Sequence, residues 1–216
     1  MNIIYLHGFQ SSENSIKGQL LKQYTAGYSN ISVHLPNLNK PPQQVMAEMS
    51  ALIESLNKVV LVGSSLGGFY ATQLMAQYQL PTVLINPAIR PWQLFRDLFQ
   101  HVRLPYQVTK TWRLDDAQLD DMQSLAVQQI PHPKLLLVLL QQGDETLDYR
   151  EAQQFYSAEE AGMALVMTDV GGSHGMDDFA EKIPMVLQFL ADAVKNMQSL
   201  SSNYQKNSEI GSCDII

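Results

Sequence analysis

Cysteine and basic residues are scarce in this sequence. The 216 residues include one cysteine, Cys213, so no intramolecular disulfide can form, and a chain without disulfides suits a reducing compartment. Lys and Arg number 14 against 21 Asp and Glu, which gives a formal net charge of −7, and no run of basic residues occurs. This charge argues against nucleic acid or an anionic membrane surface as the main partner, and it favours a small-molecule substrate.

Long hydrophobic runs are also missing. No apolar stretch reaches the roughly 18 residues that a membrane-spanning helix needs. The first ten residues, MNIIYLHGFQ, lack the basic segment and the long apolar segment of a secretory signal. We therefore expect a cytoplasmic protein without stable membrane insertion. The sequence indicates no oligomeric state.

What the chain does contain is a regular alternation of short apolar runs and amphipathic segments. With 45% hydrophobic residues it can bury one sizeable core, and we expect a single domain over residues 1–196. The alternation predicts an α/β fold with a mostly parallel sheet of about six strands flanked by helices. The expected strands are 2–6, 31–35, 58–63, 81–86, 134–140 and 163–168, and the expected helices are 14–25, 42–56, 66–79, 149–161 and 178–196.

Two segments depart from this alternation. The connection 87–133 is too long for an ordinary loop, so we expect a small helical cap over the carboxyl edge of the sheet, with helices near 91–101 and 115–128. Its aromatic residues would either form an apolar wall of a substrate pocket or pack the cap onto the core; they include Trp92, Phe95 and Trp112. Residues 197–216 are polar and aperiodic, which predicts a disordered tail.

The strongest chemical signal is the stretch GSSLG at residues 63–67. It fits the pattern G-x-S-x-G at the junction of an expected strand and an expected helix. On such a turn the Ser65 hydroxyl would stand exposed, and the Leu66 amide would point to where an oxyanion forms. The alternative is a glycine-rich loop without chemistry.

A serine nucleophile needs a histidine base, which in this architecture follows it in the chain. His174 lies in VGGSHGMDDF, directly after the last expected strand and before the last helix. A surface histidine in a glycine-rich turn is the alternative. The other histidines lack either the order or the loop position; they are His7, His34, His101 and His132.

The acid that orients the histidine should follow the strand 134–140, where QQGDETLDYREA offers Asp144, Glu145 and Asp148 as candidates. We favour Asp144, the first after the glycine, over Glu145 and Asp148. Asp148 is better explained as a helix N-cap, with Glu151 completing a capping box. Two further acids, Asp177 and Asp178, are expected to cap the final helix.

The second donor of an oxyanion hole should come from the loop after an earlier strand. YLHGFQSS follows the first strand, and its His-Gly dipeptide makes the turn. We expect the amide of Phe9 to donate, with that of Gln10 as the alternative.

Taken together, YLHGF, GSSLGG, GDETLD and GGSHG resemble the α/β-hydrolase superfamily, and in particular the small bacterial YqiA-type esterases, over roughly residues 1–194. The resemblance implies esterase activity on short acyl esters and acyl-CoA thioesters without a metal or cofactor. It implies Ser65 as nucleophile, Asp144 as orienting acid and His174 as base. It also leads us to expect that the antiparallel edge strands that open many larger hydrolases are absent.

Three other interpretations compete with a serine esterase. The triad could act on an amide, a lactone or a carbon–carbon bond. The fold could also serve a binding protein that has lost catalysis, although three triad residue types in the right order argue against it. A dinucleotide-binding domain is disfavoured, because no expected strand is followed by G-x-G-x-x-G.

Overall fold

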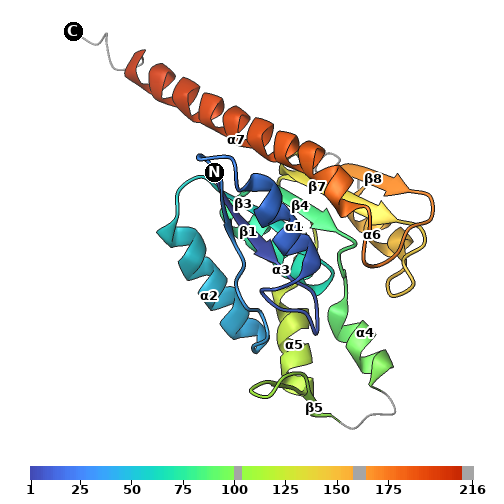
Figure 1. Ribbon diagram of the computed structural model, residues 1–216. Coiled ribbons are helices and arrows are strands. Elements are labelled where there is room, and N and C mark those ends of the chain that lie inside the picture. The colour runs from blue at the N-terminus through green and yellow to red at the C-terminus, as the bar shows by residue number, and fades with distance from the viewer. Residues whose placement is uncertain (100–103, 158–163, 211–216) are drawn as a thin grey trace.

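The centre of the molecule is a six-stranded sheet in which every pairing is parallel (Figure 1). The computed structural model describes residues 1–99, 104–157 and 164–210, and their side chains as far as residue 197. The strand order is β2-β1-β3-β4-β7-β8, which confirms the predicted fold class. The strands are β1 (Asn2–Leu6), β2 (Ser32–His34), β3 (Val59–Ser64), β4 (Thr82–Ile85), β7 (Leu136–Gln141) and β8 (Leu165–Asp169).

Helices cover both faces of this sheet. Alternate strand residues point to opposite faces: Ile3 and Tyr5 belong to one hydrophobic cluster, and Ile4 and Leu6 to the other. Burial on both faces explains why the four central strands, β1, β3, β4 and β7, are apolar almost throughout. The first face is covered by α1 (Ile16–Thr25) and α7 (Phe179–Ile210), and the second by α2 (Pro42–Ser55), α3 (Leu66–Tyr78) and α6 (Tyr149–Tyr156).

The chain order of the strands reverses between β1 and β3. From β1 the chain moves outward to β2, then crosses back to β3 and continues through β4, β7 and β8 on the other side. In parallel sheets a ligand binds in the crevice at the carboxyl ends of the strands where this reversal occurs. The loops after β1 and β3, which carry Phe9 and Ser65, lie at that point.

Residues 87–132, which we call the cap segment, contain α4 (Pro91–Leu98) and α5 (Asp116–Leu125), close to the expected helices. They also contain a small hairpin, β5 (Tyr106–Gln107) and β6 (Arg113–Leu114), that we did not predict, because two-residue strands leave no periodic pattern. A short 3-10 helix, Pro133–Leu135, leads into β7. His101 lies outside the described residues.

The C-terminal segment differs from the expectation. Helix α7 continues through Ile210, so residues 197–210 are helical and not irregular, and Figure 1 shows the helix extending past the sheet. No Gly or Pro occurs between Met185 and Ile210, so nothing in the sequence stops helix propagation before Gly211. Residues 211–216, with Cys213, lie outside the described residues. In the part of the chain that the structure describes, no helix has the length and apolarity to cross a membrane.

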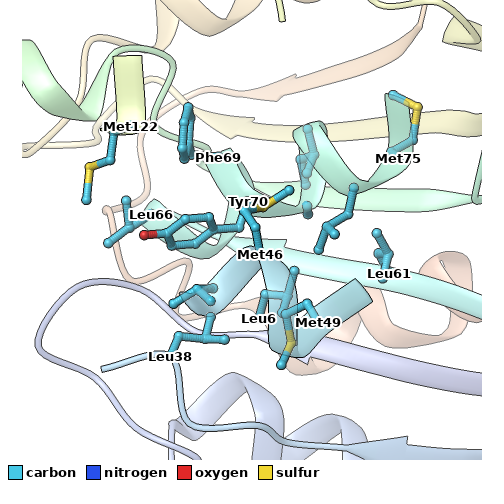
Figure 2. Close-up of a cluster of buried hydrophobic side chains, with 14 of the residues drawn as sticks. Leu6, Leu38, Met46, Met49, Leu61, Leu66, Phe69, Tyr70, Met75 and Met122 are labelled. Atoms are coloured by element: carbon cyan, nitrogen blue, oxygen red, sulfur yellow. The ribbon is translucent and has the colours of Figure 1, made fainter. Parts of the chain in front are cut away.

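The larger hydrophobic cluster contains one unusual polar atom. Tyr70 on α3 lies among Leu66, Met46 and Leu38, as Figure 2 shows. Its hydroxyl is buried and has no hydrogen-bond partner among the described residues. Burial raises the pKa of Tyr70 well above its ordinary value. This hydroxyl therefore opposes folding in its present position.

Candidate active site

The turn between β3 and α3 consists of a single residue, Ser65. Its φ of 55° lies in the left-handed region that non-glycine residues seldom adopt. The Ser65 amide donates to Ile85 O (3.0 Å), and the Ser65 carbonyl accepts from the Ala88 amide (3.1 Å), which holds the strained conformation in place. The sequence context expected for the G-x-S-x-G motif is therefore present.

Glycine on both sides of Ser65 is required by close backbone approaches. A Cβ on Gly67 would lie 2.0 Å from Leu6 O on β1, and a Cβ on Gly63 would lie 2.5 Å from Gly67 O. Neither contact is possible without moving the backbone. The two glycines thus let α3 start directly against β1 and β3.

The structure brings Ser65, His174 and Asp144 into contact. His174 Nε2 lies 3.0 Å from Ser65 Oγ, and His174 Nδ1 lies 2.8 Å from Asp144 Oδ2. A carboxylate can only accept, so Nδ1 carries the proton and Nε2 is left to accept the Ser65 hydroxyl proton. The Asp144 side chain is 2% exposed, whereas the His174 side chain is 22% exposed and open to a substrate.

The carboxylates in and after the loop that follows β7 have different hydrogen-bond partners. Asp144 Oδ1 accepts from the amides of Thr146 and Leu147 (2.8 Å each), which leaves Oδ2 for His174. Asp148 caps α6 by accepting from the Arg150 amide (3.0 Å), as expected. The predicted capping box is only half formed, because the Glu151 side chain pairs with Arg90.

The two acids before α7 do not simply cap that helix as we expected. Asp177 Oδ2 accepts from Ser173 Oγ (2.9 Å). Asp178 accepts from Gln141 Nε2 (2.7 Å) and pairs with Lys182 (2.8 Å), a hydrogen-bonded pairing that lowers the pKa of Asp178. Both side chains tie down the loop that carries His174.

The expected oxyanion donors flank Ser65. A Cβ on Gly8 would lie 3.1 Å from Ser65 Cβ and 3.6 Å from Ser65 Oγ, so the loop after β1 passes directly over Ser65. The Phe9 amide has no acceptor among the described residues. Leu66 is the first residue of α3, where the amide has no intrahelical acceptor and the helix dipole favours negative charge.

His7 supports this loop from beneath. It is buried, and its Nε2 accepts from the Leu38 amide (3.0 Å), so Nδ1 carries the proton and donates to Gly8 O (2.8 Å). Burial lowers the pKa of His7, which keeps the ring neutral. His7 is thus a support for the loop after β1, and both of its ring nitrogens are already engaged.

The cap aromatics fall into two groups. Phe95 and Trp112 are buried against the Phe9 ring, at centroid distances of 4.5 and 6.3 Å, and anchor the cap segment to the loop after β1. Trp92 instead lines a cavity of about 420 Å³, together with Phe69 and Phe155. Trp112 also borders a different cavity, of about 520 Å³, together with Asn37 and Lys40.

Two supporting residues were missed in the sequence reasoning. Asn86 and Gln141 are each 2% exposed at the ends of β4 and β7. Asn86 Nδ2 donates to Ser173 O (3.1 Å) and His174 O (3.2 Å), while its Oδ1 accepts from the Gln141 amide (2.9 Å). Gln141 Oε1 accepts from the Ser173 amide (2.8 Å). In the sequence, Asn86 and Gln141 are each a polar residue at the end of an apolar run, and this pattern was the signal that could have identified them.

No group of three or more His, Cys, Asp or Glu side chains in the described ranges is arranged to hold a metal ion.

The sequence also matches a known protein family. The family model of UPF0227, an uncharacterised protein family, matches residues 2–191 of this chain. The chain belongs to this family.

Several solved structures of other proteins are similar to this fold. Est1E of Butyrivibrio proteoclasticus, solved with ferulic acid bound, is 12% identical with a TM-score of 0.68, over 90% of this chain and 89% of Est1E. An esterase of Pyrococcus furiosus is 19% identical with a TM-score of 0.59, over 89% of this chain and 80% of the esterase. A monoacylglycerol lipase of Paleococcus ferrophilus is 15% identical with a TM-score of 0.60, over 88% and 94%. These similarities show a shared fold, which is the α/β-hydrolase fold expected from the sequence.

Proposed function

We propose that this protein is a serine hydrolase that cleaves carboxylic esters or acyl-CoA thioesters through an acyl-enzyme on Ser65. The observation that carries the proposal is the continuous hydrogen-bonded chain from Ser65 Oγ through His174 to Asp144, with contacts of 3.0 and 2.8 Å. Its place on a strained turn at the carboxyl edge of the sheet supports it. The esterases and the lipase that share the fold agree with this activity.

In the first half-reaction Ser65 Oγ attacks the acyl carbonyl carbon. His174 Nε2 takes the hydroxyl proton, and Asp144 stabilises the resulting imidazolium through Nδ1. The carbonyl oxygen becomes an oxyanion that the amides of Phe9 and Leu66 receive. Each such donor is worth about 2.7–4 kcal/mol of barrier.

Collapse of the tetrahedral intermediate breaks the bond to the alcohol or thiol. The imidazolium of His174 gives its proton to that leaving group, and the acyl group stays on Ser65 as an ester. Water then enters, loses a proton to His174 and attacks the same carbonyl carbon. The second collapse releases the carboxylic acid and returns the proton to Ser65, so no external reagent besides water is needed.

The acyl group has a candidate place beside the nucleophile. The cavity bordered by Trp92 also includes Ala88 and Phe69, whose amides donate to the Ser65 carbonyl. The cavity therefore lies against the backbone of the nucleophile turn. Its aromatic walls suit an apolar acyl chain.

Hydrolysis of p-nitrophenyl butyrate tests the proposed function. We expect turnover by the wild type and its loss in Ser65→Ala and His174→Ala, with both variants folded by circular dichroism. A folded wild type without turnover on esters and acyl-CoAs of graded length would favour the non-catalytic binding protein. Turnover that persists in His174→Ala would mean that another group acts as base.

A further inference from the structure

The loop that carries His174 has little rigidity of its own. Gly171 and Gly172 both have positive φ angles, 77° and 78°, that favour glycine. Side chains from other elements instead hold the backbone of residues 173–175. Asn86 and Gln141 bind the backbone of Ser173, and Asn86 also binds the His174 carbonyl.

Two charged side chains hold the peptide groups on either side of the His174 side chain. Glu145 Oε2 accepts from the His174 amide (2.9 Å), an interaction that lowers the pKa of Glu145. Lys17 Nζ donates to the Gly175 carbonyl (2.6 Å). Lys17 lies in the first turn of α1, a helix that contributes no triad residue. It precedes His174 by 157 positions in the chain.

A contribution to the stability of the fold does not explain why a lysine occurs at position 17. Its side chain is half-buried, and this burial lowers the pKa of Lys17 below its ordinary value. A lowered lysine pKa means that the charged form costs folding free energy at neutral pH, and that this cost disappears as the pH rises past the unfolded value. Gly175 is exposed, so water could serve its carbonyl if the lysine were absent.

The surroundings of Lys17 connect it to the triad. The charged groups that face it are Asp177, on the same loop as His174, and Asp144, the partner of the imidazole. Glu145 holds the neighbouring peptide group, and Lys182 pairs with Asp169 and Asp178 at the two ends of that loop. Lys17 thus brings a cation to the acidic group of residues around the imidazole.

We propose that Lys17 is a positioning residue for the catalytic base, and that it fixes the peptide group after His174 while Glu145 fixes the one before it. This role rests on the proposed function, in which His174 moves the proton. A displacement of about 1 Å in a catalytic group can cost up to about 100-fold in rate. We expect loss of the Lys17 contact to lower kcat about tenfold and to leave KM within about twofold.

The test compares Lys17→Met, Lys17→Arg and the control Lys22→Met, which removes the same charge from an exposed position on α1. We expect Lys17→Met to lose kcat on p-nitrophenyl butyrate without a drop in Tm, Lys17→Arg to recover most of it, and Lys22→Met to match the wild type. A structural lysine would give the reverse, a lower Tm with kcat retained. Equal kcat in Lys17→Met and Lys22→Met would overturn the proposal.

A second readout does not need turnover. In resting protein labelled with ¹⁵N-histidine, the His174 Nδ1–H that donates to Asp144 should give a low-field proton resonance, assigned by its loss in His174→Ala. We expect Lys17→Met to broaden or shift this resonance, and Lys22→Met to leave it unchanged. An unchanged resonance in Lys17→Met would overturn the positioning role even if the wild type proved inactive, whereas inactivity alone would overturn only the proposed function.

Discussion

Replacing Asn86 by alanine should destabilise the fold and disturb the histidine loop together. The substitution removes the acceptor of the Gln141 amide, which is buried in β7, and an unsatisfied buried amide costs about 1–3 kcal/mol. Asn86 also has a φ of 41°, a conformation that costs alanine about 1–2 kcal/mol. The sum is a loss of about 2–5 kcal/mol in the free energy of unfolding.

Urea unfolding measured by circular dichroism gives this loss by linear extrapolation. Asn86→Gly is the matched variant, because glycine adopts the positive φ freely while losing the same hydrogen bonds; it should be at least as stable as Asn86→Ala. Turnover should fall in both variants, since the carbonyls of Ser173 and His174 lose their donor. A loss below about 1 kcal/mol in Asn86→Ala would refute the claim that this network holds the loop.

Four further predictions follow from single features. Ser65→Gly should be more stable than Ser65→Ala by about 1 kcal/mol in urea unfolding, because glycine relieves the positive φ; a less stable glycine variant would contradict the strain argument. Tyr70→Phe should raise stability by about 1 kcal/mol by removing an unpartnered buried hydroxyl, and a lower urea midpoint would show that the hydroxyl has a partner after all. Burial lowers the pKa of His7, so the unfolded chain binds a proton on this residue more readily than the folded protein does. The free energy of unfolding should therefore fall as the pH drops below about 6.5, and it should fall less steeply in His7→Asn. Parallel pH profiles of the wild type and His7→Asn would exclude His7 as the source of this fall. Ala126→Leu, which narrows the cavity bordered by Trp92, should reduce kcat/KM for longer acyl chains more than for acetate esters, and an equal effect on all chain lengths would place the acyl group elsewhere.

Much of the fold could be predicted because the signals were local. The apolar runs lie within two residues of the observed strand bounds, and the four central strands β1, β3, β4 and β7 are apolar because they are buried on both faces. The hairpin of the cap segment was missed because its strands have two residues each. The extension of α7 was missed because polarity was given more weight than the absence of Gly and Pro after Met185.

Some residues of the candidate site could be predicted from the sequence, and others could not. Ser65, Asp144 and His174 could be named because strand-end loops of a parallel sheet meet at one edge, so order along the chain is enough to bring them together. The contacts of Asn86 and Lys17 with residues 173–175 could not be named, because they join elements that are distant in sequence through side chains without a shared motif. The cytoplasmic location stays a prediction, and so does activity on esters or acyl-CoA thioesters.

The most direct test of the central claim is covalent labelling of Ser65. Folded wild-type protein is treated with a fluorophosphonate probe, and the modified residue is located by mass spectrometry of the digested protein, with Ser65→Ala as the control. We expect one adduct per chain on Ser65, formed much more slowly in His174→Ala because the hydroxyl there lacks its base. Folded protein that carries no adduct on Ser65 would contradict the assignment of this serine as a nucleophile.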